Sequence, residues 1–64
     1  MNDREFRLSM LKLGLHTHGV QAKALGLHRK TVWRFSQEGG RTPPIVDRLV
    51  QEWLKRGRVP KEYL

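Results

Sequence analysis

The 64-residue chain contains no cysteine, which excludes a disulfide framework and a thiolate metal site. No apolar run approaches the roughly 20 residues that a membrane-spanning helix needs, and the first residues lack the order of basic and apolar residues found in a secretory signal. These absences predict a cytoplasmic protein with no membrane partner. A chain of this length forms one small domain, without room for a large active-site cleft.

Acidic residues are also scarce, because six Asp and Glu stand against thirteen Lys and Arg, for a net charge of +7. No acid lies between Arg7 and Gln37, a stretch that carries six Lys and Arg and all three histidines. A basic block without carboxylates attracts phosphates. The charge pattern therefore favours nucleic acid as the partner. An anionic membrane surface is the weaker interpretation, since the apolar residues suit a packed core.

Apolar spacing and capping residues predict an all-α protein, a compact bundle of four helices with no strand. The domain is expected to span 1–57, followed by a short C-terminal tail at 58–64. In the first helix, the expected core stripe is Phe6, Met10 and Leu13, widened by Leu8 and Leu11. The helices are expected to begin at Asn2 or Asp3, Thr17, His28 and Thr42, and to end near Gly14, Gly26, Gly39 and Gly57.

The fourth helix has more apolar surface than a small bundle needs. Ile45, Leu49 and Trp53 form one stripe, and Val46, Val50 and Leu54 form a second beside it. One stripe can cover the neighbouring helices, and the other is expected to form an exposed interface. We therefore predict a homodimer formed through this other stripe. The alternative is a monomer whose tail covers it. The predicted dimer interface consists of Ile45, Leu49, Val50, Trp53, Leu54, Tyr63 and Leu64.

The segment 17–36 has the plan of a helix-turn-helix, in which the second helix lies in the major groove of DNA. Ala22 supplies a small residue where the two helices cross, and Gly26 supplies a turn residue that tolerates a positive φ. Val32 and Phe35 are spaced to hold the third helix against the core. The pattern favours a double-stranded DNA-binding protein.

Residues 13–35, LGLHTHGVQAKALGLHRKTVWRF, resemble the helix-turn-helix of the lambda repressor/Cro-like, or XRE-type, regulators. The Ala-x-x-Leu-Gly-Leu centre at 22–27 and the Arg-x-Thr-Val-x-Arg run at 29–34 carry the likeness. The Gly-rich turn and Pro-Pro start of the fourth helix resemble small phage and mobile-element members, such as anti-CRISPR-associated repressors. The resemblance implies a sequence-specific transcriptional regulator of a bacterial or phage-infected cell, a dimeric repressor that occludes a promoter and regulates its own gene.

Two positions depart from the pattern of the family. His18 stands where members prefer a glutamine that binds phosphate, and Gln21 stands where they prefer an aliphatic residue beneath the third helix. The second departure predicts either a rotated second helix or a partly exposed Gln21.

The exposed face of the third helix is the candidate for reading bases. Arginine or lysine on it can bind guanine. Trp33 is expected to contact thymine methyls, unless it packs against the second helix or the loop before the fourth. The predicted recognition residues are His28, Arg29, Lys30, Trp33, Arg34 and Gln37. Helix starts and loops nearby are expected to meet phosphates through Thr17, His18, Gly19, Thr31, Arg41 and Thr42.

Other chemistry finds little support. His16 and His18 diverge across a helix start with no cysteine or acid beside them, which argues against a metal site. Ser9 and Ser36 have no base and orienting group at a suitable spacing, so we expect no enzyme, cofactor or small-molecule ligand. Two alternatives stay open: an antitoxin-type interaction protein with a DNA-binding domain, and a DNA-binding recombination or architectural accessory protein.

Overall fold

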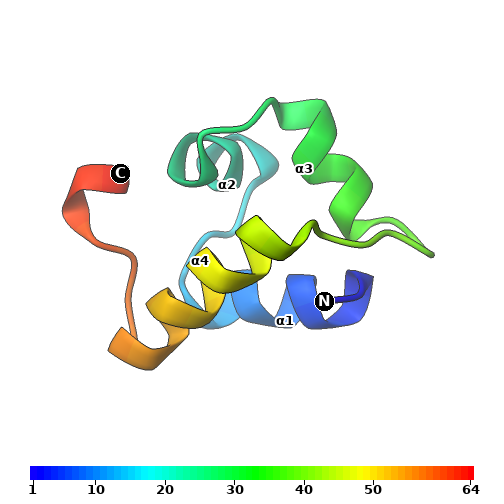
Figure 1. The fold of residues 1–64 in the computed structure, drawn as a ribbon. Helices are drawn as coiled ribbons and strands as arrows, with labels where there is room; N and C mark the ends of the chain where they lie inside the picture. The colour runs from blue at the N-terminus through cyan, green and yellow to red at the C-terminus, as the bar shows by residue number, and fades with distance from the viewer.

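The computed structural model describes all 64 residues as four α-helices and one terminal 3-10 turn, with no strand (Figure 1). The predicted all-α class and the four helices are confirmed. An isolated bridge between Asn2 and Arg41 is the one β-type contact, and no helix has the length and apolar character needed to cross a membrane. The elements are α1 (Asp3–Lys12), α2 (His18–Leu25), α3 (Arg29–Ser36), α4 (Pro44–Arg56) and η1 (Lys61–Tyr63).

The first two helices are each capped by the side chain of the residue that precedes them. The Asn2 side chain accepts a hydrogen bond from the Glu5 amide at 2.8 Å, and the Glu5 carboxylate accepts one from the Asn2 amide at 3.0 Å. This reciprocal pair is a capping box. Thr17 Oγ1 accepts from the Val20 amide at 3.2 Å. Asn2 is thus the first cap, and the predicted cap at Thr17 is confirmed.

The predicted cap at Thr42 is wrong. Pro43 is the N-cap of α4, and Pro44 is its first residue, a position that suits proline because its missing N–H would have had no partner. Thr42 lies one residue too early to cap the helix. It is buried, and its hydroxyl donates a hydrogen bond to the carboxylate of Asp47.

The same carboxylate holds the start of the chain against α4. The N-terminal ammonium of Met1 lies 2.8 Å from Asp47 Oδ2, and the Thr42 amide donates to the Met1 carbonyl at 3.1 Å. Burial alone would raise the pKa of Asp47, but hydrogen bonds from the ammonium and from Thr42, with the charge of the ammonium, lower that pKa below its ordinary value. The ion pair therefore joins the starts of α1 and α4.

All four helices contribute to one hydrophobic core. Phe6 of α1 and Phe35 of α3 meet edge to face with their ring centroids 5.5 Å apart, and Val32 and Val50 have no exposed surface. The expected core positions Phe6, Met10, Val32 and Phe35 are confirmed as buried. The core consists of Phe6, Met10, Leu15, Ala22, Ala24, Val32, Phe35, Val46, Val50, Trp53 and Val59.

Two leucines of α1 lie outside this core. Leu8 and Leu11 are 51% and 61% exposed, so the prediction that they widen the core stripe is wrong. Each residue of an α-helix turns about 100° from the last, which carries both leucines away from the face of Phe6 and Met10. Ser9 is buried beside Phe6 and Met10 instead, and its hydroxyl donates a hydrogen bond to the Glu5 carbonyl at 2.8 Å.

The inward face of α4 combines residues from the two predicted stripes. Val46, Val50 and Trp53 are buried at the spacing i, i+4, i+7, whereas Ile45 is 76% exposed. Neither predicted stripe faces inward as a unit, because an α-helix has 3.6 residues per turn and a straight i, i+4 row drifts around it. Leu49 and Leu54 flank the buried face and pack against the core from its edge.

The residues after Gly57 return to the body of the protein. Figure 1 shows the segment leaving the end of α4 and rising to η1 beside α2. Val59 is buried in the core, and the ring of Tyr63 packs against Trp53 with centroids 5.2 Å apart. The packed unit therefore continues beyond residue 57, and the tail covers Trp53 near the end of α4.

Candidate nucleic-acid interface

A tight turn places α3 across α2. The turn consists of Gly26, Leu27 and His28. Gly26 has a φ of +69°, in the left-handed region that glycine adopts without steric cost. The Leu27 amide donates to the Ala22 carbonyl at 3.0 Å, which completes the C-terminal cap of α2. The chain can thus reverse within three residues and begin α3 directly against α2.

The face of α3 turned away from the core carries all the residues predicted to read bases. Val32 and Phe35 on the inner face are 0% and 7% exposed. The tryptophan on the outer face is 49% exposed, so about half of its side chain stands in solvent. The exposed residues of the outer face are His28, Arg29, Lys30, Trp33, Arg34 and Gln37.

The cations on this face have no counter-charge within the protein. The three ion pairs of the structure involve the N-terminal ammonium, Arg7 and Arg56, so Arg29, Lys30 and Arg34 are unpaired. No acid lies in the sequence from 7 to 37. The positive charge of α3 is therefore fully available to an anionic partner, subject only to screening by salt.

Arg29 also reaches the start of α2. Its guanidinium lies against Gly19, so closely that a Cβ at position 19 would stand 3.0 Å from Nη2. The first amides of a helix have no partner within the helix, and they carry the positive end of the helix dipole. The Arg29 guanidinium therefore lies beside the first turn of α2, where the helix dipole is positive.

His28 caps α3 through one ring nitrogen. Its Nδ1 accepts a hydrogen bond from the Lys30 amide at 3.1 Å. A neutral imidazole that accepts at Nδ1 carries its proton on Nε2. The side chain is exposed, and the bond at Nδ1 holds the ring at the start of α3.

The residues predicted to meet phosphate lie in different settings. Thr17 and Arg41 are exposed, and Gly19 and Thr31 are half-buried. His18 is half-buried too, with Nε2 3.1 Å from the Ser36 hydroxyl, so its ring bridges α2 and α3. The prediction that Thr42 contacts phosphate is wrong, because its buried hydroxyl donates a hydrogen bond to the carboxylate of Asp47.

The predicted dimer interface needs correction as well. Val50 and Trp53 are 0% and 1% exposed in the single chain, so neither can form an interface. Both positions point into the core once the tail and α1 have packed. Of the remaining predicted interface residues, Leu49 and Leu54 are half-buried, and the exposed ones are Ile45, Tyr63 and Leu64.

Sequence reasoning missed one feature close to this interface. Gln21, expected to be partly exposed or displaced by a rotated helix, is only 8% exposed, and its Nε2 donates to the Leu15 carbonyl at 2.8 Å. It lines a pocket between α1, α2 and α3. The sequence carried one signal for this burial, because Gln21 stands where the resembled family has an aliphatic residue beneath the third helix. A polar side chain at that position is ordinarily interpreted as exposed.

The structure brings together no group of three or more His, Asp or Glu side chains that could hold a metal ion. Comparison of the chain with protein-family models, with curated proteins and with solved structures gave no match.

Proposed function

We propose that the protein is a sequence-specific double-stranded DNA-binding regulator, in which α2 and α3 act as a helix-turn-helix and α3 enters the major groove. The observation that carries the proposal is the outer face of α3, where three unpaired cations surround an exposed tryptophan. An α-helix with its side chains is about 10–12 Å in diameter, and a major groove about 12 Å wide admits it.

In this proposal, the residues of α3 have separate roles. Arg29 and Lys30, near the start of the helix, pair with guanine O6 and N7, which discriminates against a wrong base by about 1–3 kcal/mol for a good pair. Trp33 contacts thymine methyl groups, a use that explains why a large apolar ring stays exposed on a charged face. Thr17 and Arg41 meet backbone phosphates, which set the register of α3.

In this proposal, the protein regulates transcription by occupying its DNA site. Occlusion of a promoter needs DNA binding alone, so it is the mechanism that suits a domain of this size. We propose a homodimer, because a two-fold pair of recognition helices about 34 Å apart would read two half-sites one helical turn apart. With Val50 and Trp53 in the core, the apolar surface left on α4 for this contact is Ile45 with the outer edge of Leu49.

The test begins with selection from a library of random duplexes, because the selection itself identifies the preferred site. Fluorescence anisotropy is then measured on an enriched duplex and on its scrambled counterpart across a salt series. These measurements separate the contribution of phosphate contacts from that of base reading. Each phosphate contact adds about −0.9 to the log–log salt slope on both duplexes. Base reading appears as a gap between them, and a gap of about 10³ or more is expected for a specific regulator.

A matched pair of variants tests the surface itself. Arg34→Ala and Lys55→Ala each remove one exposed, unpaired cation, but Lys55 lies in the last turn of α4, at the opposite side of the molecule from α3 (Figure 1). Arg34→Ala should weaken binding at least tenfold more than Lys55→Ala does. Equal losses, or equal affinity for selected and scrambled duplexes, would contradict sequence reading by α3. Sedimentation of the complex gives the number of chains bound.

A further inference from the structure

The outer face of α1 carries two leucines that no other segment covers. Leu8 and Leu11 are 51% and 61% exposed, and their spacing of three residues makes them neighbours on the helix surface. The inner face of the same helix is closed, because Phe6 and Met10 are 0% and 1% exposed. Apolar side chains that adjoin one another in solvent, unlike single ones, mark surfaces for interaction.

Two cations flank these leucines. Arg4 and Lys12 stand four residues before and four residues after Leu8, so they lie on the same face of the helix. Both are exposed, and neither belongs to any of the three ion pairs of the structure. Their charges are therefore free to attract carboxylates on another molecule.

The two acids of α1 do not offset these cations. The Asp3 carboxylate pairs with Arg7 Nη1 at 3.1 Å, and the Glu5 carboxylate accepts a hydrogen bond from the Asn2 amide at 3.0 Å in the capping box. No further acid follows in the sequence before residue 38. The outer face of α1 thus combines apolar surface with positive charge that has no counter-charge in the protein.

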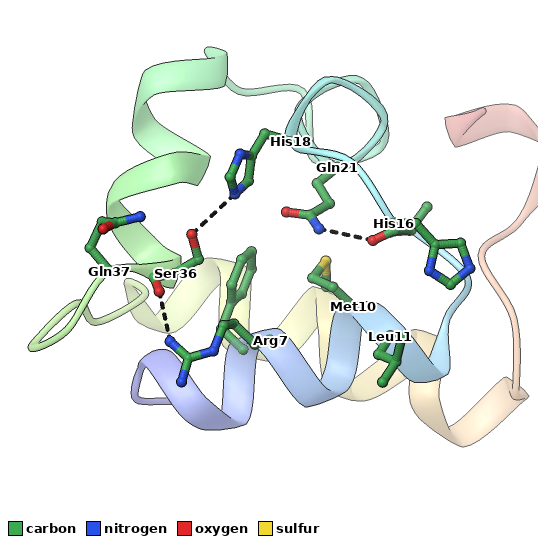
Figure 2. A pocket seen from close by; sticks show the side chains of 10 residues that line it. Arg7, Met10, Leu11, His16, His18, Gln21, Ser36 and Gln37 are labelled. Carbon is green, nitrogen blue, oxygen red and sulfur yellow. Dashed lines mark hydrogen bonds between the residues drawn. The ribbon is translucent and has the colours of Figure 1, made fainter.

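Leu11 also borders the open pocket between α1, α2 and α3 (Figure 2). Figure 2 shows Arg7 at one end of this pocket and Leu11 with His16 at the other. Arg7 and His16 are exposed, and no carboxylate lines the pocket. The apolar surface of Leu11 therefore continues into a recess that carries no negative charge.

We propose that the outer face of α1 docks an acidic amphipathic segment of another protein. In this contact the apolar residues of the partner cover the leucines, and its carboxylates lie beside the flanking cations, an arrangement that steers association and fixes orientation. The docking surface consists of Arg4, Leu8, Leu11 and Lys12.

This surface and the outer face of α3 lie on opposite sides of the core. The inner faces of the two helices meet through Phe6 and Phe35, whose ring centroids are 5.5 Å apart, so the outer faces are directed away from each other. The protein can hold the partner while α3 occupies a groove. The inference nevertheless does not rest on DNA binding, because it uses none of the residues proposed to contact DNA.

Other occupants fit this face less well. A two-fold contact between copies sets the same patch on both sides, so Arg4 and Lys12 of one copy would meet the same cations of the other. Nucleic acid would pair with the cations but leave the leucines in water. Binding to an anionic bilayer scales with the apolar area that is buried, and this ten-residue helix offers only two exposed leucines.

The test begins with random peptides displayed on phage and selected against the 64-residue chain without DNA. An excess of the Leu8→Gln/Leu11→Gln double variant in solution removes peptides that bind elsewhere. This variant should keep its fold and melting temperature, because both positions are exposed and glutamine has a helix propensity close to that of leucine. The enriched peptides are expected to combine large apolar residues with an excess of aspartate and glutamate.

An enriched peptide is then titrated into ¹⁵N-labelled protein, where shifts are expected at the amides of residues 4–12. The double variant should lower the affinity at least about tenfold, as for residues at the centre of an interface. Val20→Gln is the control, since Val20 is an apolar residue of α2 that is 42% exposed, and it should leave the affinity within about twofold.

A second pair of variants tests the charges. Arg4→Gln with Lys12→Gln should weaken binding of the peptide and reduce its dependence on salt. Arg48→Gln with Lys55→Gln removes the same charge from exposed, unpaired positions of α4 and should leave the salt dependence nearly unchanged.

Several outcomes would overturn the proposal: no enriched peptide, enriched peptides without acids, shifts confined to other helices, or equal effects of the two charge pairs. Leucine-dependent binding to phosphatidylglycerol vesicles would do the same, since lipid would then be the occupant. So would self-association of the free protein that the double variant loses. None of these measurements uses DNA, so a failure of the proposed regulator function would be seen separately.

Discussion

The guanidinium of Arg29 lies against Gly19, so that a Cβ added at position 19 would stand 3.0 Å from its Nη2. This contact joins the first turns of α2 and α3, the two helices of the proposed DNA-binding unit. It also supplies a way to move a residue of the proposed recognition face without deleting it, because the atom that must yield is the end of a flexible side chain.

Gly19→Ala should therefore lower DNA affinity while leaving the fold intact. We expect binding to weaken by about 1 kcal/mol as Arg29 is displaced, a part of the about 1–3 kcal/mol that a good base pair contact supplies. Thermal stability should stay equal or rise slightly, since alanine favours a helix over glycine. Anisotropy and thermal unfolding measure the two effects. In an Arg29→Ala background, Gly19→Ala should have no further effect on binding; a persisting loss would show that the contact is not its cause.

The ion pair between Asp47 and the N-terminal ammonium predicts an acid-sensitive stability. Because the pKa of Asp47 is lowered in the folded protein, the unfolded chain binds the proton more readily. The stabilisation is thus complete above the unfolded value of about 3.9 and is lost as the pH falls through the lowered pKa. Asp47→Asn should cost about 1–2 kcal/mol at pH 6, and its deficit should shrink toward pH 2. Urea unfolding at several pH values measures this difference, and a deficit that does not depend on pH would contradict the ion pair.

Trp53 and Ile45 belong to the same apolar helix but differ in role. Trp53→Ala removes a side chain that is 1% exposed and should cost about 3–5 kcal/mol, a large share of the stability of so small a domain. Ile45→Ala changes a residue that is 76% exposed and should cost less than about 0.5 kcal/mol. Circular dichroism melting curves compare the two. If Trp53→Ala stayed folded and lost only self-association, Trp53 would be an interface residue after all.

The segment after Gly57 is expected to stabilise the domain. Ending the chain at Gly57 removes Val59 from the core and Tyr63 from Trp53. The loss of a buried valine and a partly buried ring should cost about 2–4 kcal/mol. Replacing Lys61 and Glu62, both exposed, with alanine in the full chain is the control and should leave the melting temperature nearly unchanged. A truncated chain with unaltered stability would show that the tail is an appendage.

The sequence by itself determined that the chain forms four helices and where the first three of them begin. The capping bonds of Asn2, Thr17 and His28 each join groups no more than three residues apart, and the turn at Gly26 depends on one residue that tolerates a positive φ. Interactions of such short range depend only on neighbouring residues, so the sequence predicts them. The outer face of α3 was predictable for the same reason, because Val32 and Phe35 define its inner face.

Only the tertiary structure decided which faces of the other helices are buried. Apolar spacing predicts an interface role for Val50 and Trp53 and a core position for Leu8, because spacing does not state which neighbour will cover a side chain. The contacts that decide which side chains are buried involve residues from different segments of the chain. Asp47 pairs with the N-terminal ammonium 46 positions earlier, and the ring of Tyr63 packs against Trp53. The pocket beside Gln21 arises likewise from three helices, since burial is a property of the packed assembly and not of any one segment.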